Sequence, residues 1–144
     1  MGEWLLTYRG VVYPQQCDHM EHMNVMYYVG KFDEATWQMF AAIGLTPEYM
    51  RTNNCGVAAV RQNISYRREL RAGGLLSIRT AILEIHSKKI GFYHEMTNDE
   101  NGELAATTVI TGVHIDTLER KARPFPPDVV ETAKRLILDV TPVL

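Results

Sequence analysis

The sequence predicts an α+β domain in which an antiparallel sheet curls around one long helix, on two observations. Between residues 24 and 44, apolar side chains recur at three- and four-residue intervals, the period of a helix enclosed by other elements. After Gly56, runs rich in branched and aromatic residues predict four strands, at residues 57–70, 75–86, 89–97 and 103–116. The chain has 144 residues, 46% of them hydrophobic, so we expect residues 1–144 to form one domain with one core.

A strand over residues 4–12 opens the chain, because branched and aromatic side chains dominate there. The long helix begins after Asn24, whose side chain suits an N-cap, and ends near Gly44, which suits the left-handed residue after a last turn. Thr46-Pro47 then pairs a cap with a first-turn proline and predicts a short helix to about residue 52. Both helices therefore have their own start signals.

Short turn sequences separate the later strands, the first of them Ala72-Gly73-Gly74. Turns of this length make hairpins, so we expect a meander of consecutive antiparallel neighbours. A short sixth strand at residues 121–123 and a terminal helix at residues 127–138 complete the chain. Alternation gives each strand one face that would receive the helix, formed by Ala58, Val60, Gln62, Ile64 and Tyr66, then by Leu76, Ile78, Thr80 and Ile82, and then by Ile90, Phe92, His94 and Met96. Sheet edges without a partner favour pairing with a second copy, so we expect a homodimer or homotetramer.

Composition excludes several classes of partner. With 15 basic and 17 acidic residues, the formal net charge is −2 and no basic surface for nucleic acid is predicted. No stretch approaches the roughly 18 apolar residues that span a bilayer, and the first ten residues are unlike a secretory leader, so we expect a cytoplasmic protein without membrane contact. Cys17 and Cys55 are far apart in the sequence, so we expect neither a disulfide framework nor a thiolate metal site.

The segment before the long helix carries the sharpest motif. Residues 12–28 resemble the signature of the 4-hydroxybenzoyl-CoA thioesterase family, in which V-x-P precedes D-x-x-G-H-V-N-N and a tyrosine follows four residues after the first asparagine. Asp18, His22, Asn24 and Tyr28 fall on the motif positions. The resemblance covers most of the chain in element order, and it implies the hotdog fold.

Two residues depart from the family motif. Glu21 stands where the family usually has glycine, and Val25 where it often has a second asparagine. Farther along, residues 64–73 are similar to the family's segment before its first hairpin, although Glu69 and Gly74 replace the common proline and aspartate.

The resemblance implies an acyl-CoA thioesterase that needs no metal or redox cofactor, with Asp18 as catalytic carboxylate and coenzyme A as part of the substrate. The chemistry gives an independent reason for this pattern. Thioester hydrolysis needs a carboxylate that attacks the carbonyl or activates water, and donors for the developing oxyanion. Asp18 lies just ahead of a helix N-terminus, whose free amides around Val25 and Met26 are oriented donors.

Each motif residue also has a structural interpretation. Asn24 suits a helix cap, Tyr28 suits helix packing, and His22 either orients the thioester or water or bonds to the backbone. Glu34 is the rival carboxylate, because some hotdog thioesterases use an acid on the central helix. For the acyl group, an apolar lining is indicated by Trp37, Met39, Phe40 and Tyr49.

Basic residues near strand ends are candidates to meet the phosphates of coenzyme A, namely Arg67, Arg68, Lys88 and Lys89. Three other interpretations stay open. The first is a non-catalytic module that binds acyl-CoA. The second is a hydratase or dehydratase on the same fold, although the D-x-N-P-x-H loop sought for that activity does not match. The third is a metal site formed by His19, Glu21 and His22.

Overall fold

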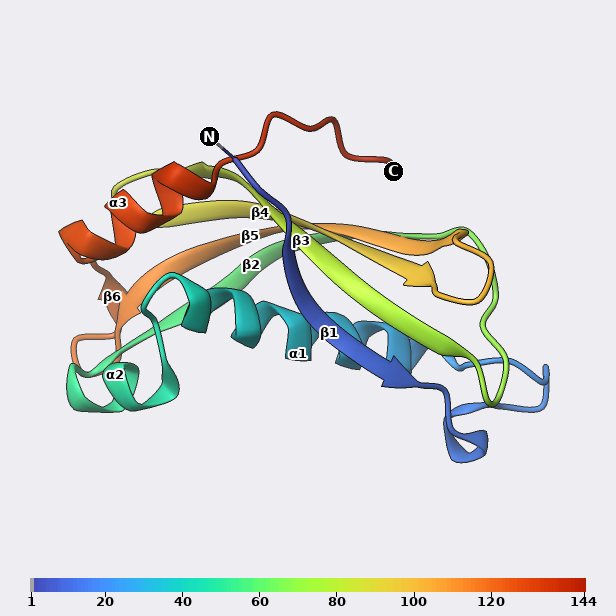
Figure 1. The fold of residues 1–144 in the computed structure, drawn as a ribbon. Coiled ribbons are helices and arrows are strands. Elements are labelled where there is room, and N and C mark those ends of the chain that lie inside the picture. Colours follow the sequence, from blue (N-terminus) through green and yellow to red (C-terminus); the bar gives the residue numbers. More distant parts are fainter. Residues whose placement is uncertain (1) are drawn as a thin grey trace.

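A computed structural model of the chain describes residues 2–144 as a six-stranded antiparallel sheet that curls around helix α1 (Figure 1). The elements are β1 (Leu5–Val11), the 3-10 turn η1 (Pro14–Gln16), α1 (Val25–Ala42), α2 (Pro47–Thr52), β2 (Cys55–Tyr66), β3 (Leu75–Ile85), β4 (Lys89–Asn98), β5 (Leu104–Asp116), β6 (Lys121–Ala122) and α3 (Pro127–Leu136). These bounds lie close to the predicted ones. The helix α1 is capped by Asn24 as predicted, and Gly44 adopts a left-handed φ of 102°.

The predicted meander is wrong at its first turn. The strand order is β1-β3-β4-β5-β2, so β2 pairs with β5, and β3 pairs with β1 and β4. Residues 67–74 do not form a hairpin because their backbone is bonded to other elements. Gly73 and Gly74 exchange hydrogen bonds with Val12, and Leu70 accepts one from Met23. The segment is therefore a crossover that leaves β2 at one edge of the sheet and carries the chain to β3.

The core lies between α1 and the concave face of the sheet. Phe32, Ala35 and Met39 are fully buried on α1, and the predicted apolar residues of β3 and β4 are buried opposite them. Burying one such large apolar side chain stabilises the fold by about 1.5–3 kcal/mol. This packing fixes α1 along the sheet, and therefore fixes where the loop before α1 lies.

A buried polar chain crosses this core. Thr36 donates its hydroxyl to the carbonyl of Phe32, so it accepts from Nε2 of His94 at 2.8 Å. The other ring nitrogen, Nδ1, then accepts from the hydroxyl of Thr80 at 2.7 Å. His94 has no exposed surface, and burial lowers its pKa to about 3, so the ring is neutral.

The convex face of the sheet is covered by both ends of the described chain (Figure 1). Glu95 accepts from Arg79 and from the hydroxyl of Tyr93, which lies 2.7 Å away. That hydroxyl in turn accepts from the backbone N–H of Val143 at 3.0 Å, and Trp4 covers the Arg79 guanidinium at 3.8 Å. The C-terminal segment is thus fastened to the sheet by polar side chains of β4.

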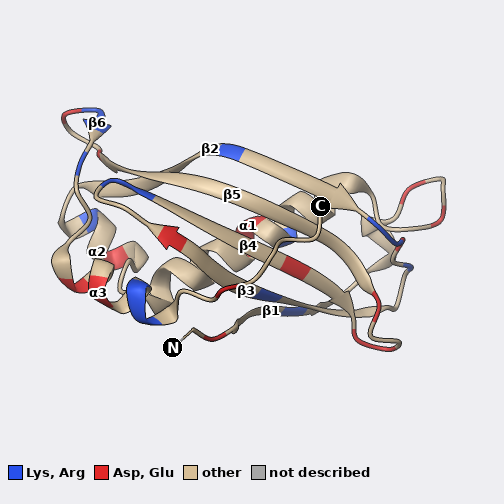
Figure 2. Ribbon diagram, turned by 90° about the horizontal axis from the view of Figure 1, so that it is seen from above, with Lys and Arg blue, Asp and Glu red and all other residues tan. Residues whose placement is uncertain are grey.

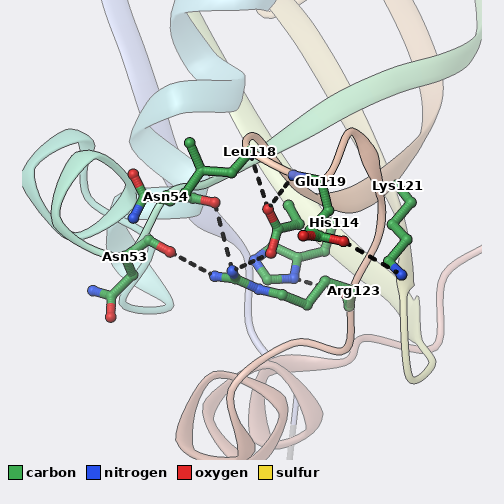
Figure 3. A network of polar contacts seen from close by, with 8 residues as sticks. Asn53, Asn54, His114, Leu118, Glu119, Lys121 and Arg123 are labelled. Carbon is green, nitrogen blue, oxygen red and sulfur yellow. Dashed lines mark hydrogen bonds and ion pairs between the residues drawn. The ribbon is translucent and has the colours of Figure 1, made fainter.

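A second polar cluster joins the residues after α2 to the end of β5 and to Arg123, which directly follows β6 (Figure 3). Arg123 donates to Asp116 at 3.0 Å and to the carbonyls of Asn53 and Asn54. The Nδ1 of His114 lies 2.8 Å from the carbonyl of Arg123 and therefore donates to it. Arg123 satisfies backbone carbonyls at the end of α2, so the cluster has a structural explanation.

Candidate active site

The loop before α1 folds back on itself and places Asp18 beside the helix start. A bridge pairs Cys17 with Met23, and the N–H of Asp18 donates to the carbonyl of His22. Glu21, at the tip, has a left-handed φ of 66°. This explains the glycine of the family motif, because glycine adopts that conformation without steric cost.

Each carboxylate oxygen of Asp18 accepts one hydrogen bond. The side-chain amide of Asn24 donates to Oδ2 at 2.8 Å, and the backbone N–H of Met20 donates to Oδ1 at 2.8 Å. These two bonds, the Asn24 bond most, lower the pKa of Asp18 below its usual value of 3.8. Asp18 is therefore an ionised, oriented carboxylate at neutral pH.

Asn24 serves both the helix and the carboxylate. While its amide nitrogen holds Asp18, its Oδ1 accepts from the N–H of Met26 at 3.0 Å and caps α1. The expectation that the Met26 amide is a free oxyanion donor is therefore wrong, because the cap occupies it. The N–H of Val25 has no partner among residues 2–144, so it is the first-turn amide available to a ligand.

Tyr28 and His22 contact the crossover segment. The Tyr28 hydroxyl donates to the carbonyl of Arg68 at 3.1 Å, so this side chain fastens the crossover to α1. Nε2 of His22 lies 3.7 Å from a carboxylate oxygen of Glu69. The ring of Tyr66 packs edge-on against Tyr28, with the centroids 5.3 Å apart. Burial raises the pKa of Tyr28, which keeps its hydroxyl protonated as a donor.

These side chains surround one cavity of about 440 Å³, within the size range of small-molecule sites. Its lining consists of Asp18, His22, Met23, Asn24, Val25, Tyr28, Tyr66, Arg67, Arg68 and Glu69. The four motif residues Asp18, His22, Asn24 and Tyr28 therefore meet Val25 and two of the predicted phosphate-binding residues, Arg67 and Arg68. Glu69 and Tyr66 were not predicted in this role, because nothing in the sequence shows that the crossover returns to the loop before α1.

Lys88 and Lys89 are not brought to this cavity. Lys89 pairs with Val113 on β5, whereas Tyr66, which lines the cavity, pairs with Ala106. Seven residues of strand separate the two β5 positions, about 24 Å at the rise of an extended chain. Lys88 and Lys89 therefore belong to the opposite end of the sheet. Figure 1 shows that the turn from β3 into β4 lies there, beside α3.

The rival carboxylate and the expected acyl lining also lie elsewhere. Glu34 borders a different hollow, between α1 and β1. Trp37 and Phe40 line a separate small hollow of about 100 Å³ beside Phe92. Met39 is fully buried in the core, and Tyr49 packs against that core from α2. The expected lining does not form one surface around Asp18.

The interpretation of His19, Glu21 and His22 as a metal site gains no support. Among the described residues, no three histidine, cysteine or acidic side chains are placed to share a metal ion. In the same part of the chain, every helix is too short or too polar to cross a membrane.

Comparison with known proteins places the chain in a family. Residues 12–132 match the thioesterase-like superfamily. The chain is 28% identical over 119 residues to an L-carnitine dehydrogenase/betainyl-CoA thioesterase of Agrobacterium fabrum, a match that covers 83% of this chain and 24% of that protein. It is 22% identical over 136 residues to a betainyl-CoA thioesterase of Pseudomonas aeruginosa, covering 94% of this chain and 86% of that protein.

The fold is shared with solved structures. A Staphylococcus aureus protein in complex with CoA superposes with a TM-score of 0.89 at 19% identity, covering 98% of this chain and 90% of that one. The chain spans only about a quarter of the length of the Agrobacterium relative. The match over residues 12–132 shows that the chain belongs to the thioesterase-like superfamily, and its sheet curled around α1 is the hotdog fold.

Proposed function

We propose that the chain hydrolyses the thioester of an acyl-coenzyme A to a free acid and coenzyme A, with Asp18 as the catalytic carboxylate. The observation that carries this proposal is the Asp18 carboxylate, held ionised by Asn24 and Met20 at the mouth of a cavity that also contains a free helix amide. A carboxylate beside an oriented N–H donor is the minimum that thioester hydrolysis requires.

Two routes use the same geometry. As a nucleophile, Asp18 adds to the thioester carbonyl, the carbon–sulfur bond breaks, and water then cleaves the resulting anhydride. As a general base, Asp18 takes a proton from water while the water oxygen adds to the carbonyl, and the proton is passed to the leaving thiolate. In both routes the carboxylate must be ionised, as the lowered pKa of Asp18 provides.

The oxyanion that forms on the carbonyl oxygen needs a donor, and the N–H of Val25 is proposed for this role. It belongs to the first turn of α1, where the helix dipole adds a favourable partial positive charge. Loss of one such donor typically costs about 3 kcal/mol of transition-state stabilisation. His22 and Tyr28 are proposed to position the substrate and the crossover, and Arg67 and Arg68 to meet its phosphates.

The acyl group is open to a direct test, and the relatives name the first candidate. Two of them carry the name betainyl-CoA thioesterase, so betainyl-CoA heads a panel that also contains short, long and aromatic acyl-CoAs. Release of free thiol from each acyl-CoA measures turnover. A substrate class is assigned where kcat/KM is highest.

The catalytic proposal is tested with Asp18→Asn beside the native chain. We expect this variant to lose about 100-fold or more in kcat, because amides are poor nucleophiles and bases. Asp139→Asn is the matched control, since Asp139 is exposed in the C-terminal segment far from the cavity. Turnover that survives in Asp18→Asn would move the chemistry to another residue. Binding of acyl-CoA without turnover by the native chain would favour the non-catalytic binding module.

We also propose a homodimer that pairs along β2. This strand is an edge of the sheet, and Val60 is 61% exposed there. On α1, which packs on the concave face, Met26 and Trp37 are also exposed. An edge strand of twelve residues is a template for a second copy, and apolar side chains at its flank favour that pairing.

A further inference from the structure

Glu69 lies on the crossover, and the backbone on both sides of it is fastened to the region where α1 starts. The Tyr28 hydroxyl donates to the carbonyl of Arg68 at 3.1 Å, and the N–H of Met23 donates to the carbonyl of Leu70 at 2.7 Å. Each of these bonds joins the crossover to a residue far away in the chain. The crossover is therefore fixed in place, and it presents the Glu69 side chain to the candidate active site.

The carboxylate of Glu69 faces two basic side chains. Its Oε2 lies 3.7 Å from Nε2 of His22, and its Oε1 accepts from Nη2 of Arg71 at 3.0 Å. The side chains of His22 and Glu69 are 30% and 51% exposed, so their contact adds little to the stability of the fold. A distance of 3.7 Å is that of an ion pair, and catalytic contacts are often this long before a substrate binds. Basic and acidic segments lie together at this end of the molecule (Figure 2).

His22 lies on the same loop as Asp18 and lines the same cavity. The N–H of Asp18 donates to the carbonyl of His22 at 3.3 Å. After the hydrogen bond from Asn24, which has the largest effect, the charge of the nearby His22 also lowers the pKa of Asp18. Nε2 of the imidazole faces Glu69, and Nδ1 has no hydrogen bond to residues 2–144. Nδ1 is therefore the ring nitrogen that is available to a substrate.

We propose that His22 delivers a proton to the sulfur of the leaving coenzyme A, and that Glu69 is the residue that positions His22. The inference rests on the proposed function. As the carbon–sulfur bond breaks, its electron pair goes to sulfur, which takes the proton from Nδ1. The ring then recovers a proton from the attacking water, directly or through Asp18, so one water is consumed for each acid and thiol released. Glu69 fixes the orientation of the ring through Nε2, as the third group of a catalytic triad does.

The family that the motif resembles does not imply this pair, because proline is common there at the position of Glu69. Nor does the fold need it, since an exposed ion pair contributes little to stability. What the pair does provide is a cationic donor with a fixed orientation beside the carboxylate of Asp18. The leaving sulfur departs next to that carboxylate, where His22 lines the same cavity.

The need for such a proton depends on the leaving thiol. An alkyl thiolate, such as that of pantetheine or coenzyme A, is a basic leaving group whose departure is assisted by a proton. The thiolate of para-nitrothiophenol is a weak base and leaves without one. A proton donor therefore accelerates the hydrolysis of the first kind of thioester much more than that of the second. A residue that only stabilises the fold affects both kinds equally.

The test compares two thioesters of the same acyl group, one with pantetheine and one with para-nitrothiophenol, so that neither carries a nucleotide. We expect Glu69→Gln to lower kcat/KM about tenfold for the acyl-pantetheine and less than about twofold for the aryl thioester. His22→Gln has the same selectivity with a larger loss, about 100-fold, and Glu69→Asp falls between the native chain and Glu69→Gln. Glu103→Gln is the matched control, because Glu103 is 49% exposed and also pairs with one arginine, Arg68.

Equal losses for the two thioesters in Glu69→Gln, or no loss for either, would overturn the inference. Loss of both activities in Asp18→Asn concerns the proposed function alone. Nitrogen NMR of the His22 ring tests the pair without any turnover. We expect the Nε2 resonance to move in Glu69→Gln and to stay in place in Glu103→Gln. A resonance that is the same in Glu69→Gln and the native chain would show that the two side chains do not pair in solution, and the inference would fail.

Discussion

Asn24 couples the stability of a helix to the ionisation of a carboxylate. Its Oδ1 caps α1 through Met26, and its amide nitrogen holds Oδ2 of Asp18. Since this bond is the largest cause of the lowered pKa of Asp18, Asn24→Ala raises that pKa. We expect the acid limb of the kcat/KM profile to move to higher pH and the free energy of unfolding to fall by about 1 kcal/mol.

The measurement for Asn24→Ala is a pH–rate profile of thiol release together with urea denaturation at neutral pH. Asn24→Asp is the comparison, because aspartate still caps α1 but repels Asp18. An acid limb that stays in place in Asn24→Ala, with only stability reduced, would show that Asn24 is a cap and nothing more.

Glu21 carries backbone strain that a glycine would not. Its φ of 66° lies in the left-handed region, and its side chain is exposed. A non-glycine residue there is disfavoured by roughly 1–2 kcal/mol, offset in part by the greater freedom of glycine in the unfolded chain. We expect Glu21→Gly to raise the free energy of unfolding by about 0.5–1 kcal/mol in urea denaturation. A loss of stability would mean that the Glu21 side chain makes a stabilising contact.

His94 makes stability depend on pH. The unfolded histidine binds a proton with a pKa of 6.5, whereas the folded one stays neutral to about 3. The unfolded state therefore binds more protons in this window, and stability falls as pH drops from 6.5 toward 3, by up to about 1.4 kcal/mol per pH unit. Asp18 and Asp116 have pKa values below 3.8 in the folded chain, so the stability that they contribute is lost mainly below that pH.

The prediction for His94 is tested by urea denaturation between pH 7 and pH 4.5. We expect His94→Gln, which keeps hydrogen-bonding groups but does not titrate, to flatten the slope. Part of the pH dependence of stability that remains would come from His114, because burial lowers the pKa of that ring too. His86→Gln is the control, because that ring is exposed at the turn between β3 and β4. Equal slopes in the native chain and His94→Gln would contradict the prediction.

At the residue scale, the sequence located one half of the site. Asp18, His22, Asn24 and Tyr28 fall on a contiguous motif, and the loop and α1 bring them together through local bonds. Glu69 could not be predicted, because its place near His22 depends on the crossover, more than forty residues away in the chain. The two hydrogen bonds of Asn24, to Asp18 and to Met26, could not be predicted either, because they depend on the rotamer that caps α1.

At the scale of helices and strands, the structure differs from the sequence prediction where strands pair over a long range. Every predicted helix and strand exists, because periodicity and caps are local signals. The pairing of β2 with β5 instead of β3 is not local, since it depends on the backbone bonds of Gly73, Gly74 and Leu70. β2 also has a bulge between Ala59 and Arg61, which turns Val60 to solvent. Alternation alone does not reveal such an extra residue.

The strand β4 holds the C-terminal segment through Tyr93. Its hydroxyl donates to Glu95 and accepts from the N–H of Val143, and its pKa is raised by burial to about 12. Tyr93→Phe removes both bonds and leaves a buried carboxylate oxygen without a donor, so we expect a loss of about 1–3 kcal/mol of unfolding free energy. Urea denaturation measures this loss. Tyr13→Phe is the control, because the Tyr13 side chain is 54% exposed. Equal stability of the two variants would show that the C-terminal segment is not fastened through Tyr93.

For the whole molecule, the exposed edge of β2 sets the expected assembly. Val60→Lys places a charge on that edge, which blocks pairing with another strand. We expect sedimentation velocity to show a dimer for the native chain and a larger monomer fraction for this variant. Leu118→Lys, at a residue 72% exposed in the turn after β5, serves as the control. A native chain that sediments as a monomer would remove the proposed dimer.

The covering of the convex face by both chain ends bears on how the protein can be handled and joined to others. Trp4 packs near Tyr93 and Val143 is bonded to the same side chain, so both ends leave the fold on the side of the sheet opposite α1 (Figure 1). An affinity tag, a fluorescent label or a genetically fused enzyme at either end would project from that side. The cavity around Asp18 lies at the start of α1, away from that side, so under the proposed function a covalently linked neighbour would not obstruct the entry of substrate.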